Sequence, residues 1–216
     1  MLSIKKYKNI KIVNHPLFTD KMATLRNKYT SLGDFRSTIK DISMFLCYET
    51  MKDVPTIKQK IVTPLEATIQ NVIASNKICL VPILRAGLAM SEGFLELLPR
   101  AKVGHLGLYR DPKTHKPVEY FCKLPKDIKN LNVYLLDPMF ATGGSAIDAV
   151  NTLKKHGVKN ITFVCMVAAP EGVIAFRKKF KDVPIVIGVL DRQLNKNKYI
   201  LPGIGDAGDR IFGTED

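Results

Sequence analysis

One stretch near the middle of the chain, VYLLDPMFATGGS at positions 133–145, constrains the fold more than any other. Its first part, residues 133–136, is continuously apolar, which is typical of a strand buried on both faces of a parallel sheet. Asp137 follows where such a strand would end, and residues 146–156 have a helical pattern. Ligands of open α/β sheets bind just outside the carboxyl ends of the strands. The stretch therefore predicts a binding site between a strand and a helix.

The glycine-containing loop of this stretch is suited to a phosphate group. Gly143 and Gly144 let the backbone approach an anion closely, and Thr142 and Ser145 supply hydroxyl donors. The amides at the start of the following helix add positive potential. For the loop alone, an ordinary turn with Thr142 or Ser145 as helix cap is an alternative. The Walker pattern G-x-x-x-x-G-K-[ST] is absent from the stretch.

Strand and helix patterns alternate along much of the chain. Apolar strands are expected at residues 78–84, 103–109, 161–168 and 185–190, and helices at residues 15–29, 34–51, 87–98 and 170–180. Residues 56–62 alternate like a strand, residues 65–73 are ambiguous between strand and helix, and residues 110–125 form a polar, proline-containing excursion. The alternation predicts an α/β fold, a mostly parallel sheet flanked by helices, in one domain over residues 1–216.

Composition indicates a globular protein with a basic surface. The chain is 46% hydrophobic, and 33 lysines and arginines against 20 acids give a net charge of +13. The charge is interpreted as a solvated lysine-rich face, because no aromatic–basic motif of an RNA-binding module is present. The four cysteines form no C-x-x-C pair, which is typical of free thiols in a reducing cytoplasm. No apolar run reaches the length of a membrane span, so no membrane association and a cytoplasmic location are expected.

Other turns also fall at predicted strand ends. Arg85 follows the strand at residues 78–84, and a guanidinium there suits a phosphate, although a surface arginine paired with an acid is the alternative. Arg110 follows another strand. Residues 203–208 formally match G-x-G-x-x-G, but only eight residues remain after Gly208, too few for a dinucleotide-binding βαβ unit. A tight loop around a small polar ring is the preferred interpretation.

Four segments together resemble the uracil phosphoribosyltransferases: VPILRAG at 81–87, DPMFATGGS at 137–145, AAPEG at 168–172 and YILPGIGDAGDRIFGT at 199–214. The resemblance implies a type I phosphoribosyltransferase fold with a β-arm or hairpin excursion and a C-terminal base-binding loop. It also implies transfer of the phosphoribosyl group of 5-phosphoribosyl diphosphate (PRPP) to N1 of uracil, giving UMP and pyrophosphate in pyrimidine salvage. Pro138 replaces the second acid of the general type I motif, as in the uracil enzymes. Phe140 stands where leucine is usual, and its ring is expected to narrow the space beside the ribose phosphate.

The resemblance also implies the site residues. Arg85, Arg110 and Asp137 are expected to be catalytic. The PRPP site is expected to comprise Arg85, Arg110, Asp137, Pro138, Met139, Phe140, Ala141, Thr142, Gly143, Gly144, Ser145 and Asp206. The uracil site is expected to comprise Ile200, Gly205, Asp206 and Ala207. Mg²⁺ would be held mainly by substrate and water, without a set of protein ligands.

The implied partners are uracil, PRPP, a GTP activator and further copies of the chain in a homodimer or higher homo-oligomer. Nucleic acid is not expected as a partner. Three other functions stay open at this point: a phosphoribosyltransferase for another base, an RNA-binding regulator of pyrimidine genes on the same fold, and an inactive structural homologue.

Overall fold

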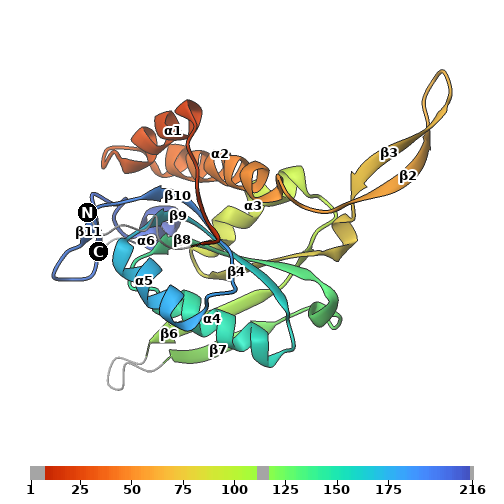
Figure 1. Cartoon of the computed structure of the whole chain (residues 1–216). Helices are drawn as coiled ribbons and strands as arrows, with labels where there is room; N and C mark the ends of the chain where they lie inside the picture. Colours follow the sequence, from red (N-terminus) through yellow and green to blue (C-terminus); the bar gives the residue numbers. More distant parts are fainter. Residues whose placement is uncertain (1–7, 111–116, 215–216) are drawn as a thin grey trace.

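The computed structural model describes residues 8–110 and 117–214, which form a mostly parallel eight-stranded sheet between two layers of helices (Figure 1). Neighbouring strands of this sheet are parallel except for the last pair, β6 and β7. The strands follow the order β1 (Ile10–Ile12), β10 (Ile185–Leu190), β9 (Asn160–Ala168), β8 (Asn132–Phe140), β4 (Ile78–Leu84), β6 (His105–Arg110) and β7 (Pro117–Lys123), with β5 (Lys102–Val103) beside β4.

Helices cover both faces of the sheet, each over its own hydrophobic core. One face carries α1 (Pro16–Arg26), α2 (Leu32–Met51), α3 (Gly87–Leu97) and the short α6 (Ala207–Phe212), and the other carries α4 (Gly144–Lys155) and α5 (Pro170–Lys179). Side chains alternate along β8, so that Leu135 faces α4 and α5 while Tyr134 and Leu136 face the other layer. This confirms the α/β fold with a buried central strand.

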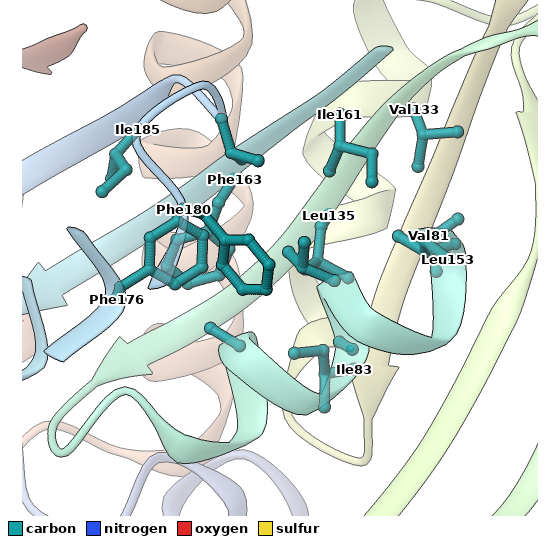
Figure 2. Packing of buried hydrophobic residues seen from close by; sticks show 14 of the residues in the cluster. Val81, Ile83, Val133, Leu135, Leu153, Ile161, Phe163, Phe176, Phe180 and Ile185 are labelled. Carbon is teal, nitrogen blue, oxygen red and sulfur yellow. The ribbon is translucent and has the colours of Figure 1, made fainter. Parts of the chain in front are cut away.

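Phenylalanine rings pack against one another in the core under α4 and α5. Figure 2 shows Phe163, Phe176 and Phe180 gathered between these helices and the sheet. The ring of Phe140 belongs to the same cluster, with its centroid 4.7 Å from that of Phe163, and the residue is 1% exposed. The ring therefore fills the core, and only its edge reaches Gly143 of the loop, where an added Cβ would lie 3.3 Å from Cε2 of Phe140. The narrowing of the space beside a ribose phosphate stays a prediction.

The central strand is longer than predicted. Asp137 lies inside β8, since Asp137, Met139 and Phe140 continue the pairing with β9. The pairing of β8 with β4 stops at Leu136, so beyond that point the strand has a neighbour on one side only. A proline is tolerated on such an open side of a strand, which explains why Pro138 does not end β8.

Several elements were missed or left ambiguous in the sequence. Residues 65–73 contain β3 (Ala67–Ile73), which forms an antiparallel hairpin with β2 (Thr56–Val62) that projects from the body (Figure 1). β1 was not predicted. The excursion at 110–125 includes β7, which is antiparallel to β6, whereas residues 111–116 lie outside the described part. Among described residues, no helix combines the length and apolarity that a membrane span requires.

The tail begins with a second small hairpin. β11 (Gln193–Leu194) pairs with β12 (Ile200–Leu201) in antiparallel fashion, and a loop at residues 202–206, called the tail loop below, leads into α6. The loop contains two glycines with positive φ, Gly203 at 63° and Gly205 at 76°. These angles favour glycine, which explains why the tail is rich in this residue.

Candidate active site

A cavity of about 330 Å³ lies at the carboxyl ends of β4 and β8 and is closed on one side by the tail. It brings together three segments that are far apart in the sequence: the turn after β4, the end of β8 with the following loop, and the tail. The predicted site residues that line it are Arg85, Asp137, Met139, Ala141, Ser145, Ile200, Gly205, Asp206 and Ala207. The cavity therefore joins the predicted phosphate side to the predicted base side.

Other predicted residues lie beside the cavity without lining it. Pro138 and Phe140 have buried side chains, and Thr142, Gly143 and Gly144 continue the loop between Ala141 and Ser145. Arg110 ends β6, and its side chain lies outside the described residues.

Four of the lining residues have no predicted role. Ala86, Lys198, Tyr199 and Gly208 also line the cavity. Lys198 and Tyr199 directly precede Ile200, and a cation and an aromatic ring beside a predicted base-binding residue are the signal that could have identified them.

Asp137 is the half-buried carboxylate of the cavity. The Met139 amide donates a hydrogen bond to its Oδ1 at 3.2 Å. Burial raises the pKa of Asp137 to about 7, against the smaller opposing effect of that hydrogen bond. The neighbouring thiol of Cys165 also has a pKa raised well above its ordinary value, first by its own burial and then by the charge of Asp137. Asp137 can thus change its protonation state near neutral pH.

The amino ends of two helices face the cavity region without side-chain caps. Gly143 is the capping residue of α4, with φ 83°, and Ala86 is that of α3; neither helix has a side-chain cap hydrogen bond. The Gly144 amide lies 3.5 Å from the Thr142 hydroxyl, at the limit of hydrogen bonding. Thr142 or Ser145 as a helix cap, the alternative for this loop, is therefore not what the structure shows. The positive potential at the amino end of a helix without a side-chain cap suits an anionic group.

Arg85 follows β4 and reaches toward α6. Its Nη2 lies 3.7 Å from Oδ1 of Asp209, and its guanidinium lies 5.5 Å from the centroid of the Phe212 ring. The side chain is 58% exposed. An ion pair of this length and exposure contributes little stability, so the guanidinium remains accessible to an anion in the cavity.

The residues of the predicted uracil site lie in the tail, on one side of the cavity. Ile200 and Ala207 are 3% and 2% exposed, so their side chains anchor the two ends of the segment. Between them Gly205 lines the cavity. Asp206 caps α6 by accepting a hydrogen bond from the Asp209 amide at 3.0 Å. Such a segment can read a small planar ring through N–H and C=O groups.

Within residues 8–110 and 117–214, no group of three histidines, cysteines or acids is placed to hold a metal ion. The acids that line the cavity are Asp137 and Asp206, whose oxygens are the kind of ligand that Mg²⁺ prefers. This set fits a magnesium ion that keeps most of its ligands from water and a phosphorylated substrate.

A larger cavity, of about 530 Å³, lies at the opposite edge of the sheet. Asn132, Asn160 and Ile185 line it, so it is at the amino ends of β8, β9 and β10. Because ligands of α/β sheets bind at the carboxyl ends, and because the predicted site residues line only the smaller cavity, the smaller one is the candidate active site.

Comparisons with known proteins agree with this geometry. The family model described as uracil phosphoribosyltransferase matches residues 12–214. The uracil phosphoribosyltransferase of Clostridium novyi is 49% identical over 203 residues, which is 94% of this chain and 97% of that protein. That of Agathobacter rectalis is 51% identical over 205 residues, covering 94% and 98%.

Solved structures show the same fold. The AQ2163 protein from Aquifex aeolicus superposes with a TM-score of 0.90 at 39% identity, covering 95% of this chain and 99% of that one. Adenine phosphoribosyltransferase from Trypanosoma brucei, with a TM-score of 0.59 and 13% identity over 90% of this chain and 89% of its own, shares the fold alone. On the family match and these identities, the chain belongs to the uracil phosphoribosyltransferase family.

Proposed function

We propose that this chain transfers the phosphoribosyl group of PRPP to N1 of uracil and releases pyrophosphate, giving UMP for pyrimidine salvage. Membership of the family supports this reaction. The structural observation that carries it is one cavity shared by Asp137, the loop before α4 and the tail. Neither the family match nor the geometry favours the alternative of an RNA-binding regulator.

The PRPP side comprises Asp137, the loop from Ala141 to Ser145 and Arg85. The loop amides and the uncapped start of α4 would bind the 5-phosphate. Asp137, in its ionised form, would accept hydrogen bonds from the ribose hydroxyls. Arg85 would bind the diphosphate beside the start of α3. The assignment of Arg110 to the same phosphates rests on the family resemblance.

The uracil side comprises Ile200, Gly205, Asp206 and Ala207. Uracil presents two carbonyl oxygens and an N3–H, which main-chain N–H and C=O groups can pair. Cytosine has an exocyclic amine and an unprotonated N3, so it would leave buried groups unpaired. Such a loss costs about 1–3 kcal/mol for each buried group, which is enough for strong discrimination.

The reaction needs no protein nucleophile. Uracil N1 forms a bond to C1 of the ribose and loses its proton to the leaving pyrophosphate or to water. The bond from C1 to the diphosphate breaks at the same time, and both electrons of that bond leave with pyrophosphate. The protein aligns the two substrates and stabilises charge. The guanidinium of Arg85 stabilises the negative charge of the leaving group, and the Asp137 carboxylate lies near the positive charge that develops on the ribose.

Magnesium would be coordinated by PRPP oxygens and water with help from Asp206, and it would neutralise part of the diphosphate charge when bound. We further propose a homodimer or higher homo-oligomer and activation by GTP, both on the family resemblance. A cytoplasmic location is supported by the four cysteines, which are all free.

The test is conversion of labelled uracil to UMP by the purified chain, with PRPP and Mg²⁺ and with each omitted. UMP should form only when both are present. Cytosine, adenine and hypoxanthine serve as control bases, and turnover of one of these in place of uracil would overturn the assignment. Salt-dependent binding to a specific RNA without turnover would instead favour the regulator.

A further inference from the structure

The end of α1 holds an ion pair that no step of the proposed reaction uses. Arg26, the last residue of α1, donates from Nη1 and Nη2 to the two carboxylate oxygens of Asp191 at 2.9 and 2.6 Å. Asp191 is 7% exposed, and its own amide donates to the carbonyl of Ala168 at 2.8 Å. The pair is therefore two-pronged, largely buried and fixed to the end of β9.

Both residues of this ion pair form a hydrogen bond with the main chain of Gly203 in the tail loop. The Gly203 amide donates to Oδ2 of Asp191 at 2.8 Å, and the Gly203 carbonyl accepts from Nη1 of Arg26 at 2.8 Å. A Cβ atom at Gly203 would lie 2.2 Å from the carbonyl oxygen of Ile200, so the loop folds back tightly at this point. Both main-chain hydrogen-bonding groups of Gly203 are thus held by charged side chains.

A second arginine, Arg210, links the next residue of the tail loop, Ile204, to the end of α1. Arg210 donates from Nη1 to the carbonyls of Ile204 and Leu25, both at 2.8 Å, and from Nη2 to that of Asn27 at 2.7 Å. Leu25 and Asn27 flank Arg26, so the end of α1 holds Gly203 directly through Arg26 and is linked to Ile204 through Arg210. The residue that follows them is Gly205, which lines the cavity.

We infer that Arg26 and Asp191 are positioning residues that set the uracil-binding conformation of the tail loop. The inference rests on the proposed function. Recognition of uracil by main-chain groups depends on the directions of the N–H and C=O groups. A fixed backbone conformation of the tail loop is therefore needed for specificity.

The PRPP side of the cavity comprises Asp137, the loop before α4 and Arg85, and the main-chain hydrogen bonds of the ion pair go to Gly203 and Ala168 instead. Of the tail loop, only Asp206 is assigned to PRPP, through Mg²⁺. Loss of the pair should therefore weaken uracil binding selectively.

The test uses Arg26→Lys and Asp191→Asn in the full chain. Lysine cannot reproduce the two-pronged contact together with the bond to the Gly203 carbonyl, and asparagine removes the charge at nearly constant shape. We expect the KM for uracil to rise tenfold or more, with the KM for PRPP within twofold of wild type.

Arg177→Lys is the matched control. Arg177, in α5, is also a buried arginine, 4% exposed, and it donates to the backbone carbonyls of Val183 and Asn9 at 2.7 Å each. Within the described residues, none of its hydrogen bonds goes to the tail loop. This variant should lower the Tm without moving the KM for uracil. Two results would overturn the inference. One is that Arg177→Lys raises the KM for uracil as much as the test variants do, at an equal loss of Tm. The other is that Arg26→Lys and Asp191→Asn both leave the KM for uracil unchanged.

Amide hydrogen exchange of the unmodified protein gives a reading that needs no variant. The Gly203 amide should exchange slowly although it lies in a loop, because it is bonded to a buried carboxylate. Exchange as fast as in an open loop would contradict the inference even if both variants failed to fold. Absence of uracil turnover by the wild type would instead refute the proposed function, so the two failures are distinguishable.

Discussion

Gly172, in the first turn of α5, packs directly against the carbonyl oxygen of Ala141 in the loop before α4: a Cβ atom added at Gly172 would lie 2.5 Å from it. The contact is reciprocal, since a Cβ at Gly143 would lie 2.8 Å from the carbonyl oxygen of Gly172. Two backbones thus touch where side chains would hold them apart. This contact gives a physical role to the AAPEG segment, for which the sequence suggested none. Its glycine, Gly172, packs against the backbone of the phosphate loop.

Gly172→Ala should therefore impair PRPP binding. The added methyl group meets backbone atoms, so the loop or α5 must move. Displacement of a substrate-positioning segment by about 1 Å can cost up to about 100-fold in rate. We expect kcat/KM for PRPP to fall by about 10- to 100-fold, measured by steady-state kinetics at saturating uracil.

Gly33→Ala is the matched control, because Gly33 also lies in the first turn of a helix, α2, and an added Cβ there would meet nothing within 4 Å. It should leave kcat/KM for PRPP unchanged and raise stability by a few tenths of a kcal/mol, up to about 1. A Gly172→Ala enzyme with wild-type kinetics would show that the phosphate loop tolerates the shift.

Asp137→Asn should lower kcat by about 100-fold while the fold stays intact, because the neutral amide cannot supply the negative charge opposite the ribose. The Asn side-chain oxygen can still accept the Met139 amide, so the local structure should persist. Circular dichroism and single-turnover kinetics would check the two parts. Near-wild-type turnover would remove Asp137 from the mechanism.

The raised pKa of Asp137 predicts a pH profile for the same residue. Ribose hydroxyls pair with the ionised form, so kcat/KM for PRPP should increase with pH up to about 7, the pKa of Asp137, and level off above it. PRPP itself also titrates, and Asp137→Asn is the control for this, since its profile should lack the contribution of the carboxylate. Parallel profiles for the two proteins would assign the pH dependence to the substrate.

Stability should follow the opposite direction. Between the ordinary pKa of 3.8 and the folded value of about 7, the unfolded chain loses the Asp137 proton while the folded one keeps it. The unfolded state then binds fewer protons, so this residue lowers the free energy of unfolding progressively from about pH 4 to pH 7. Urea unfolding should show Asp137→Asn gaining stability relative to wild type across that window, and a constant difference would contradict the raised pKa.

The fold and most of the residues that line the cavity could be predicted from the sequence, because both follow from local patterns. Buried apolar runs identify the central strands, and polar or glycine residues after them fall at one edge of a parallel sheet. The features that could not be predicted depend on contacts between different strands and helices. The extension of β8 past Pro138 depends on where β4 stops pairing, and the contact of Gly172 with Ala141 depends on how α5 packs. The Arg26–Asp191 pair joins residues 165 positions apart, and no local sequence pattern around either residue indicates its partner.

Gly205→Val should abolish uracil binding, because Gly205 lines the cavity with φ at 76° and a valine would add both bulk and backbone strain. Gly157→Val separates these two effects. Gly157 has a similar φ of 81°, and a Cβ there would meet only Lys129, at 3.5 Å, away from the cavity. It should lose comparable stability and keep the KM for uracil. An unchanged uracil KM in Gly205→Val would show that the tail loop is not the base site.

Phe140→Leu tests whether the unusual aromatic residue serves the core or the substrate. The ring packs edge-on against Phe163 and Phe176, with centroids 4.7 and 5.8 Å away, and only its edge lies beneath Gly143. Leucine would leave part of this space empty, so the free energy of unfolding should fall by about 1 to 2 kcal/mol. Because the backbone of the loop is unchanged, the KM for PRPP should stay within about twofold, less than 0.5 kcal/mol in binding. A marked change in that KM without a loss of stability in urea unfolding would instead place the ring beside the ribose phosphate.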